Sequence, residues 1–165
     1  MATSINGMIT IGQDDSDWVS KVDWSEFDKL MRSCGIMIMG KRTYEIFGDD
    51  FPREGATNVV MTSDKKLLKQ KTPNNVIFTN KSPKDVVQMA EKRGFKKLML
   101  IGGMTLNTSF IKENLVDEIW LSVHPLIIGQ GKSLIKSLAI NKKLKTIGVK
   151  RLEEGLVQLR YEIIK

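Results

Sequence analysis

The chain has 165 residues, of which 41% are hydrophobic and 27% charged, and this composition predicts one globular domain spanning residues 1–165. No apolar run approaches the ~20 residues of a membrane span, and the first residues show no signal-peptide pattern. Cys34 is the only cysteine, so no internal disulfide can form and a reducing, cytoplasmic location is expected. With His124 as the only histidine, no metal site is expected.

The formal net charge is +7, which raises the question of a nucleic-acid partner. Lys and Arg residues are spread along the whole chain, and the densest groups are pairs without interleaved aromatic residues, at positions 65–66, 96–97 and 142–143. We therefore expect solvated lysine faces, which could also attract an anionic small molecule, and we expect neither a nucleic acid nor a membrane as partner.

Strand and helix patterns alternate from the first third of the chain onward. Trp24, Phe27, Leu30 and Met31 recur at helical spacing and predict an amphipathic helix over residues 23–32. Short apolar runs predict buried strands. Continuous runs of this kind are typical of strands in parallel sheets that are covered on both faces. These strands are expected at residues 35–39, 58–62, 75–79 and 97–101.

Two further helices are expected between and after these strands. Ser82, Pro83 and Asp85 form an N-terminal capping pattern, and Gly94 is a suitable C-cap, so a helix should lie between them. Another helix is expected at residues 105–113. The sequence thus predicts an α/β domain with helices on both faces of a mixed, mostly parallel sheet.

The last third of the chain has a different pattern. Residues 117–124 predict a long strand. Residues 144–152 and 156–164 alternate in part, and a tight turn lies between them. We expect an antiparallel hairpin added to the parallel strands.

The glycine pair Gly102-Gly103 stands where an apolar strand meets a helix. Without a Cβ, a ligand can approach the backbone, and the N–H groups of a helix start suit a phosphate. Close packing of strand and helix would explain such a turn equally well.

Several motifs together resemble the dihydrofolate reductase superfamily over nearly the whole chain. The segment MGKRTYE at residues 39–45 is similar to a strand-to-helix segment of that family, and Ile101-Gly102-Gly103 is similar to its second cofactor motif. The resemblance implies a single-domain dihydrofolate reductase-like fold with the C-terminal hairpin, and NADPH as cofactor.

The chain carries features of two branches of this superfamily. Residues 4–9, 102–110, 115–118 and 125–131 are similar to the reductase domain of riboflavin biosynthesis. Residues 39–45, and the spacing of Trp18, Asp23 and Phe27, resemble dihydrofolate reductases instead. The two branches imply different substrates.

The resemblance implies a cofactor site at the ends of several strands. Gly40 would present its amide to a phosphate, Lys41 and Arg42 would add charge, and Thr43 a hydroxyl, although exposed helix charges would look the same. Thr62 and Ser63 would meet the adenosine 2′-phosphate, with Lys65 and Lys66 nearby, which favours NADPH over NADH. The implied site also includes Lys81, Ile101, Gly102, Gly103, Met104 and Thr105.

On the substrate side, the resemblance implies Asp23 as the acid that pairs with an amino-pyrimidine edge and relays a proton through water. A helix cap is the simpler alternative for Asp23. Phe27 would contact the substrate ring, unless it only packs in the core. Trp18 would lie on a loop over the nicotinamide, and Ser122 would support the acid. Ala2 would line the substrate site at the start of a short first strand.

One position departs from the folate pattern. Counting back from Thr62, Ala56 stands where dihydrofolate reductases carry the arginine that binds the folate glutamate, and Arg53 is near but not aligned. Either Arg53 or a lysine replaces that arginine, or the substrate lacks the tail.

Three functional hypotheses follow. The first is NADPH-dependent reduction of 7,8-dihydrofolate to tetrahydrofolate in one-carbon metabolism. The rival is reduction of a ribosylaminopyrimidine phosphate in riboflavin biosynthesis, or of another pteridine-like substrate. A basic binding module without turnover is the third. The protein is expected to be a monomer or a homodimer, with residues 127–131 and the late strands as a possible dimer edge.

Overall fold

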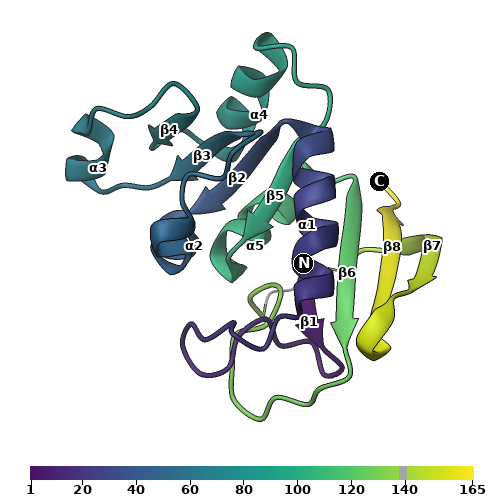
Figure 1. Ribbon diagram of the computed structural model, residues 1–165. Helices are drawn as coiled ribbons and strands as arrows, with labels where there is room; N and C mark the ends of the chain where they lie inside the picture. Colours follow the sequence, from purple (N-terminus) through teal and green to yellow (C-terminus); the bar gives the residue numbers. More distant parts are fainter. Residues whose placement is uncertain (138–140) are drawn as a thin grey trace. The chain divides into compact units, whose positions relative to one another are not determined.

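The computed structural model describes residues 1–137 and 141–165 (Figure 1). Its strands are β1 (Ala2–Ser4), β2 (Ile36–Gly40), β3 (Thr57–Met61), β4 (Val76–Thr79), β5 (Met99–Gly102), β6 (Glu118–His124), β7 (Leu144–Arg151) and β8 (Val157–Ile163). Its α-helices are α1 (Lys21–Cys34), α2 (Lys41–Phe47), α3 (Lys65–Lys69), α4 (Pro83–Lys92) and α5 (Met104–Lys112). The predicted alternation of strands and helices is confirmed, with bounds that shift by a few residues.

The chain divides into two compact units. One comprises Met1–Phe27 and Phe110–Lys165, and the other comprises Asp28–Ser109. The boundaries fall inside α1 and α5. The strands form two four-stranded hydrogen-bonded ladders, one in each unit. A single domain over residues 1–165 stays a prediction.

The ladder of the Asp28–Ser109 unit is parallel throughout, in the order β4-β3-β2-β5. Four consecutive side chains of β2, from Ile36 to Met39, are fully buried, as are Val59 and Val60 of β3. Each such burial stabilises the fold by about 1.5–3 kcal/mol, which explains why continuous apolar runs form these strands.

Capping residues set the start of two helices in this unit. The Ser82 hydroxyl accepts a hydrogen bond from the Asp85 amide at 3.2 Å and begins α4 as predicted. The Asp64 carboxylate accepts from the amides of Lys66 and Leu67 and begins α3, a one-turn helix that the sequence analysis did not predict. Five residues carry too little apolar periodicity to reveal a helix.

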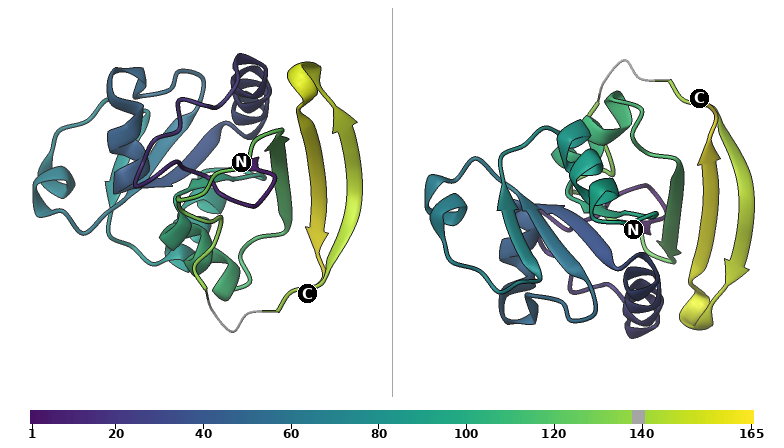
Figure 2. Two further views of the ribbon diagram at one scale, coloured as in Figure 1. Left: turned by 90° about the horizontal axis from the view of Figure 1, so that it is seen from below. Right: turned by 90° about the horizontal axis from the view of Figure 1, so that it is seen from above.

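The other ladder has the order β1-β6-β8-β7. β1 pairs with β6 in parallel, and β6, β8 and β7 pair antiparallel, as Figure 2 shows for the C-terminal hairpin. The predicted hairpin turns at Glu153–Gly155, where Glu154 and Gly155 both have positive φ. Across β6 and β8, the guanidinium of Arg160 lies 3.8 Å from the ring centroid of Trp120, a cation–π contact.

Two loops of the same unit are bound to each other by side-chain and backbone hydrogen bonds. The Asn6 side chain donates to the Ile128 carbonyl at 2.8 Å, and the Thr10 hydroxyl accepts from the Lys132 amide at 3.0 Å. Gly131 lies so close to this seam that an added Cβ would stand 1.9 Å from the Thr10 carbonyl oxygen. No helix among the described residues is long and apolar enough to cross a membrane.

The packing at Gly131 predicts a stability effect. Gly131→Ala should lower the free energy of unfolding by about 1–3 kcal/mol, because backbone must move to admit the methyl group. Gly129→Ala is the matched control, since a Cβ there meets nothing within 4 Å. Urea unfolding of both variants measures the difference, and equal stability of the two would contradict the packing argument.

Candidate functional site

The carboxyl ends of the parallel strands bring together most of the predicted cofactor residues. In the register of the ladder, Gly40 pairs with Met61, Met61 with Thr79, and Met39 with Gly102. The residues that follow each strand therefore share one edge. Ligands of open α/β sheets bind outside the carboxyl ends of the strands, so this edge is the candidate cofactor site.

Two glycines at this edge leave their backbone open. Gly40 is the N-cap of α2 and has extended backbone, with φ −83°. A Cβ on Gly40 would lie 3.8 Å from the Gly102 carbonyl oxygen, and a Cβ on Gly103 would lie 3.6 Å from Thr43 Oγ1. Both are ordinary contacts, so internal packing does not require either glycine. Close approach of a ligand to the backbone would explain why both positions are glycine, and a phosphate-bearing cofactor is such a ligand.

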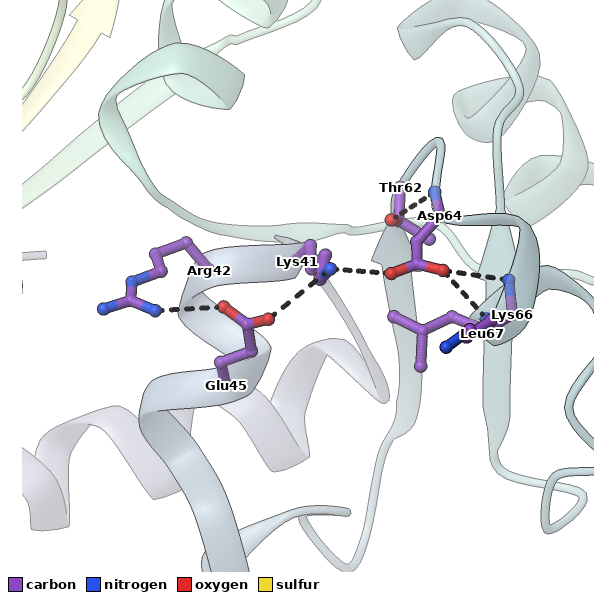
Figure 3. A network of polar contacts seen from close by, with 7 residues as sticks. All are labelled: Lys41, Arg42, Glu45, Thr62, Asp64, Lys66 and Leu67. Carbon is purple, nitrogen blue, oxygen red and sulfur yellow. Dashed lines mark hydrogen bonds and ion pairs between the residues drawn. The ribbon is translucent and has the colours of Figure 1, made fainter.

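Lys41, the predicted phosphate ligand on α2, is already engaged by carboxylates. Its ammonium lies 2.7 Å from Asp64 Oδ2 and 3.6 Å from Glu45 Oε1 (Figure 3). The Glu45 carboxylate also accepts from Arg42 at 3.2 Å. The structure therefore places an acidic residue, Asp64, among the cations expected to bind phosphate, and the sequence analysis had not included it in the site.

The pKa values of this pair respond to the contact. The hydrogen bond from Lys41 holds the pKa of Asp64 below its ordinary value, and the Lys66 amide adds to that effect. The same hydrogen bond raises the pKa of Lys41. Both groups are therefore charged at neutral pH.

The other predicted cofactor residues lie near the same strand ends. Thr62 is buried and its hydroxyl accepts from the Asp64 amide at 3.0 Å, whereas Ser63 is exposed. Lys81 is exposed two residues beyond β4, and its amide donates to the Thr79 hydroxyl. Ile101 belongs to β5, and Met104 and Thr105 open α5 directly after the glycine pair. Their roles stay predictions.

A second cluster of polar side chains lies in the unit of Met1–Phe27 and Phe110–Lys165. Asp23, in the first turn of α1, is 7% exposed, and Ser122 of β6 is buried. Ala2 of β1 pairs with Ser122 in the ladder. At the end of β6, His124 is 5% exposed, with Nε2 at 4.0 Å from Asp23 Oδ2. From the sequence, His124 bears only on the absence of a metal site, and its position beside Asp23 is not predicted.

Two backbone groups fix the tautomer of His124. The Ser20 amide donates to Nε2 at 3.3 Å, so Nε2 accepts. Nδ1 lies 3.2 Å from the Ser122 carbonyl, which can only accept, so Nδ1 carries the proton. Through these contacts His124 positions the Ser20 backbone beside Asp23, whose own amide donates to Ser20 Oγ at 3.3 Å.

Trp18 packs on this histidine. The two ring centroids lie 5.0 Å apart with an interplanar angle of 89°, an edge-to-face contact. The Trp18 indole Nε1 is buried and has no hydrogen-bond partner among the described residues. A buried donor without a partner is costly, and a polar atom of a ligand could satisfy it.

The remaining predicted substrate residues have protein partners. Phe27 makes an edge contact with Trp24 at a centroid distance of 5.4 Å. Arg53, one of the alternatives for binding a folate tail, donates from Nη2 to Asp28 Oδ1 at 2.5 Å. Ala56 is buried and offers no charge. Among the described residues, no group of three His, Cys, Asp or Glu side chains could hold a metal.

Comparison with known proteins identifies the family. The model of the RibD C-terminal domain matches residues 1–158. An uncharacterized protein of Bacillus subtilis, YyaP, is 26% identical and covers 98% of this chain and 91% of its own length. A 2,5-diamino-6-ribosylamino-4(3H)-pyrimidinone 5′-phosphate reductase of Archaeoglobus fulgidus is 33% identical over 78 residues, which are 42% of this chain and 33% of that protein.

Solved structures share the fold. The crystal structure of a putative riboflavin biosynthesis protein from Shewanella sp. PV-4 superposes with a TM-score of 0.78 at 22% identity, over 100% of this chain and 97% of that chain. The predicted dihydrofolate reductase-like fold is confirmed.

The predicted folate substrate is wrong. The family match and the pyrimidinone reductase relative contradict reduction of dihydrofolate, and with it a place in tetrahydrofolate synthesis and one-carbon metabolism. The spacing of Trp18, Asp23 and Phe27, which resembles dihydrofolate reductases, therefore did not identify the substrate. Ala56 and residues 102–131 carried the informative signal, and the chain belongs to the RibD C-terminal domain family.

Proposed function

We propose that this protein is an NADPH-dependent reductase of a ribosylaminopyrimidine phosphate, acting in riboflavin biosynthesis or on a closely similar pyrimidine. The observation that carries the proposal is the family match over residues 1–158, which supports an oxidoreductase. The open glycine backbone at the strand ends adds independent support for a phosphate-bearing cofactor.

The cofactor would supply a hydride. In the proposed site, the Gly40 and Gly103 backbones approach its pyrophosphate. Lys41, whose ammonium reaches Asp64 after β3, balances the charge of the additional phosphate of NADPH, with Arg42 nearby on α2. Thr43 is near enough to Gly103 to add a hydroxyl. Each of these residues lies at the carboxyl edge of the β4-β3-β2-β5 ladder, so one rigid element positions them all.

Reduction of a ribosylamine also needs a proton. An N-glycosylamine opens to an imine, which accepts a hydride at carbon and a proton at nitrogen. We propose that the buried Asp23 relays this proton to the nitrogen. His124 and Ser20 position Asp23. The Trp18 indole N–H offers a donor to a polar substrate atom.

An NADPH oxidation assay tests the function directly. Absorbance at about 340 nm should fall when 2,5-diamino-6-ribosylamino-4(3H)-pyrimidinone 5′-phosphate is added, and the product should carry two more hydrogens by mass spectrometry. Dihydrofolate serves as the comparison substrate and should give no turnover. Absence of turnover with every ribosylaminopyrimidine phosphate tested would overturn the proposal.

Gly40→Ala tests the open backbone. The fold should tolerate the methyl group, because its nearest contact is 3.8 Å away and φ at Gly40 is negative. The dissociation constant for NADPH should rise by about tenfold or more, the equivalent of one charge-assisted hydrogen bond. Nicotinamide fluorescence measures binding and a thermal melt checks the fold. Unchanged affinity would remove Gly40 from the cofactor site.

Asp23→Asn tests the acid. If Asp23 governs the proton, kcat should fall by about 100-fold or more while the dissociation constant for NADPH stays within twofold. Asp17→Asn is the matched control, because Asp17 is exposed and lies in the loop just before α1. A kcat for Asp23→Asn close to that of Asp17→Asn would exclude Asp23 from the chemistry and leave the reductase proposal standing.

A further inference from the structure

Asp64 is a carboxylate in a place where the sequence predicts cations and hydroxyl groups. It follows β3 by three residues and lies 2.7 Å from the ammonium of Lys41, which begins α2 after β2 (Figure 3). The contact thus joins the ends of two neighbouring strands. The Asp64 side chain is 27% exposed and that of Lys41 is 42% exposed, so a ligand in solution can reach the pair.

Local hydrogen bonds hold the Asp64 carboxylate in this position. Its Oδ1 accepts from the Lys66 amide at 2.9 Å, which caps α3, and its own amide donates to Thr62 Oγ1 at 3.0 Å. Its Oδ2 is left for Lys41. Because the cap and the Thr62 contact fix the backbone and one oxygen, the carboxylate cannot simply swing away when an anion approaches Lys41.

We infer that Asp64 is a specificity-determining residue of the proposed cofactor site: it occupies Lys41 and weakens binding of the phosphate that NADPH has and NADH lacks. The inference rests on the proposed function, since it assigns a role within that cofactor site. A phosphate that reaches Lys41 must share the ammonium with a fixed carboxylate, and the two anions repel each other.

The order of the strands indicates that the phosphate near Lys41 and Asp64 is the additional phosphate of NADPH, and not the pyrophosphate. The open glycines lie at the ends of β2 and β5, which are neighbours, whereas Asp64 follows β3 on the other side of β2. We place the pyrophosphate, which both dinucleotides have, at the glycines. A phosphate bound beyond the end of β3 then lies at least one strand spacing, about 4.8 Å, from the pyrophosphate. The adenosine ribose carries the additional phosphate of NADPH at such a distance from the pyrophosphate.

The experiment compares Asp64→Asn with Asp85→Asn. Asparagine can still cap α3, so the first variant removes the charge and keeps the local structure. Asp85 also lies in the first turn of a helix of the same unit, and its carboxylate accepts from Ser82 Oγ at 2.7 Å. The second variant therefore removes an equal charge that forms no ion pair with Lys41 among the described residues. Thermal melts confirm that both variants fold.

Dissociation constants for NADPH and NADH are measured by nicotinamide fluorescence in all three proteins. We expect Asp64→Asn to bind NADPH about three- to fivefold more tightly and NADH within twofold of the unchanged protein, since an exposed charge interaction has this size. Asp85→Asn should leave the ratio of the two constants unchanged. Adenosine 2′,5′-bisphosphate and adenosine 5′-monophosphate, which differ by the same phosphate, should repeat the pattern without a nicotinamide.

Each other pattern overturns the inference. Equal tightening of both dinucleotides would assign Asp64 a general electrostatic effect, and weaker NADPH binding would mean that Asp64 holds Lys41 in place for the phosphate. Because binding is measured without a pyrimidine, lack of turnover would defeat the proposed activity alone. Turnover with an unchanged NADPH to NADH ratio would defeat the Asp64 inference alone, and no nucleotide binding by any variant would defeat both.

Discussion

Parallel pairing of four strands is the constraint on which the candidate cofactor site depends. Strands that run in the same direction end at the same edge, so residues separated by up to about sixty positions in sequence become neighbours there. The buried side chains of β2 and β3 hold that edge rigid. Gly40 and Asp64 can then differ in chemistry without any change to the framework, whereas Gly102, with φ +99°, favours glycine.

Residues at strand ends were predictable to different degrees. The apolar runs that form β2, β3, β4 and β5 are strong signals, and the Ser82 cap marked α4 correctly. Asp64 escaped notice because a five-residue helix has no periodicity, and because its partner Lys41 is 23 positions away. The position of His124 could not be predicted for a related reason. Its contacts with Asp23 and Ser20 join residues about a hundred positions apart, and they are visible only in the structure.

The substrate was harder to predict than the fold. Fold follows from many buried positions whose contributions add, whereas a substrate is selected by a few side chains whose spacing can be shared between enzymes with different chemistry. Asp23 in the first turn of α1 illustrates the point. Asp23 is buried there, and a buried carboxylate alone does not identify the ring system that it binds. Ala56, where dihydrofolate reductases carry an arginine, and the segments at residues 102–110, 115–118 and 125–131 pointed to the correct branch of the superfamily.

The seam between residues 5–12 and 128–133 has a consequence for how this chain can vary. Its hydrogen bonds join Asn6 to Ile128, Gly12 to Gln130, and Thr10 to Lys132, so each loop position faces a defined position of the other. With Gly131 against the Thr10 carbonyl, an insertion or deletion inside either loop would break hydrogen bonds to the other loop. The length of each loop is therefore constrained by the other, and residues outside the seam are free of this constraint.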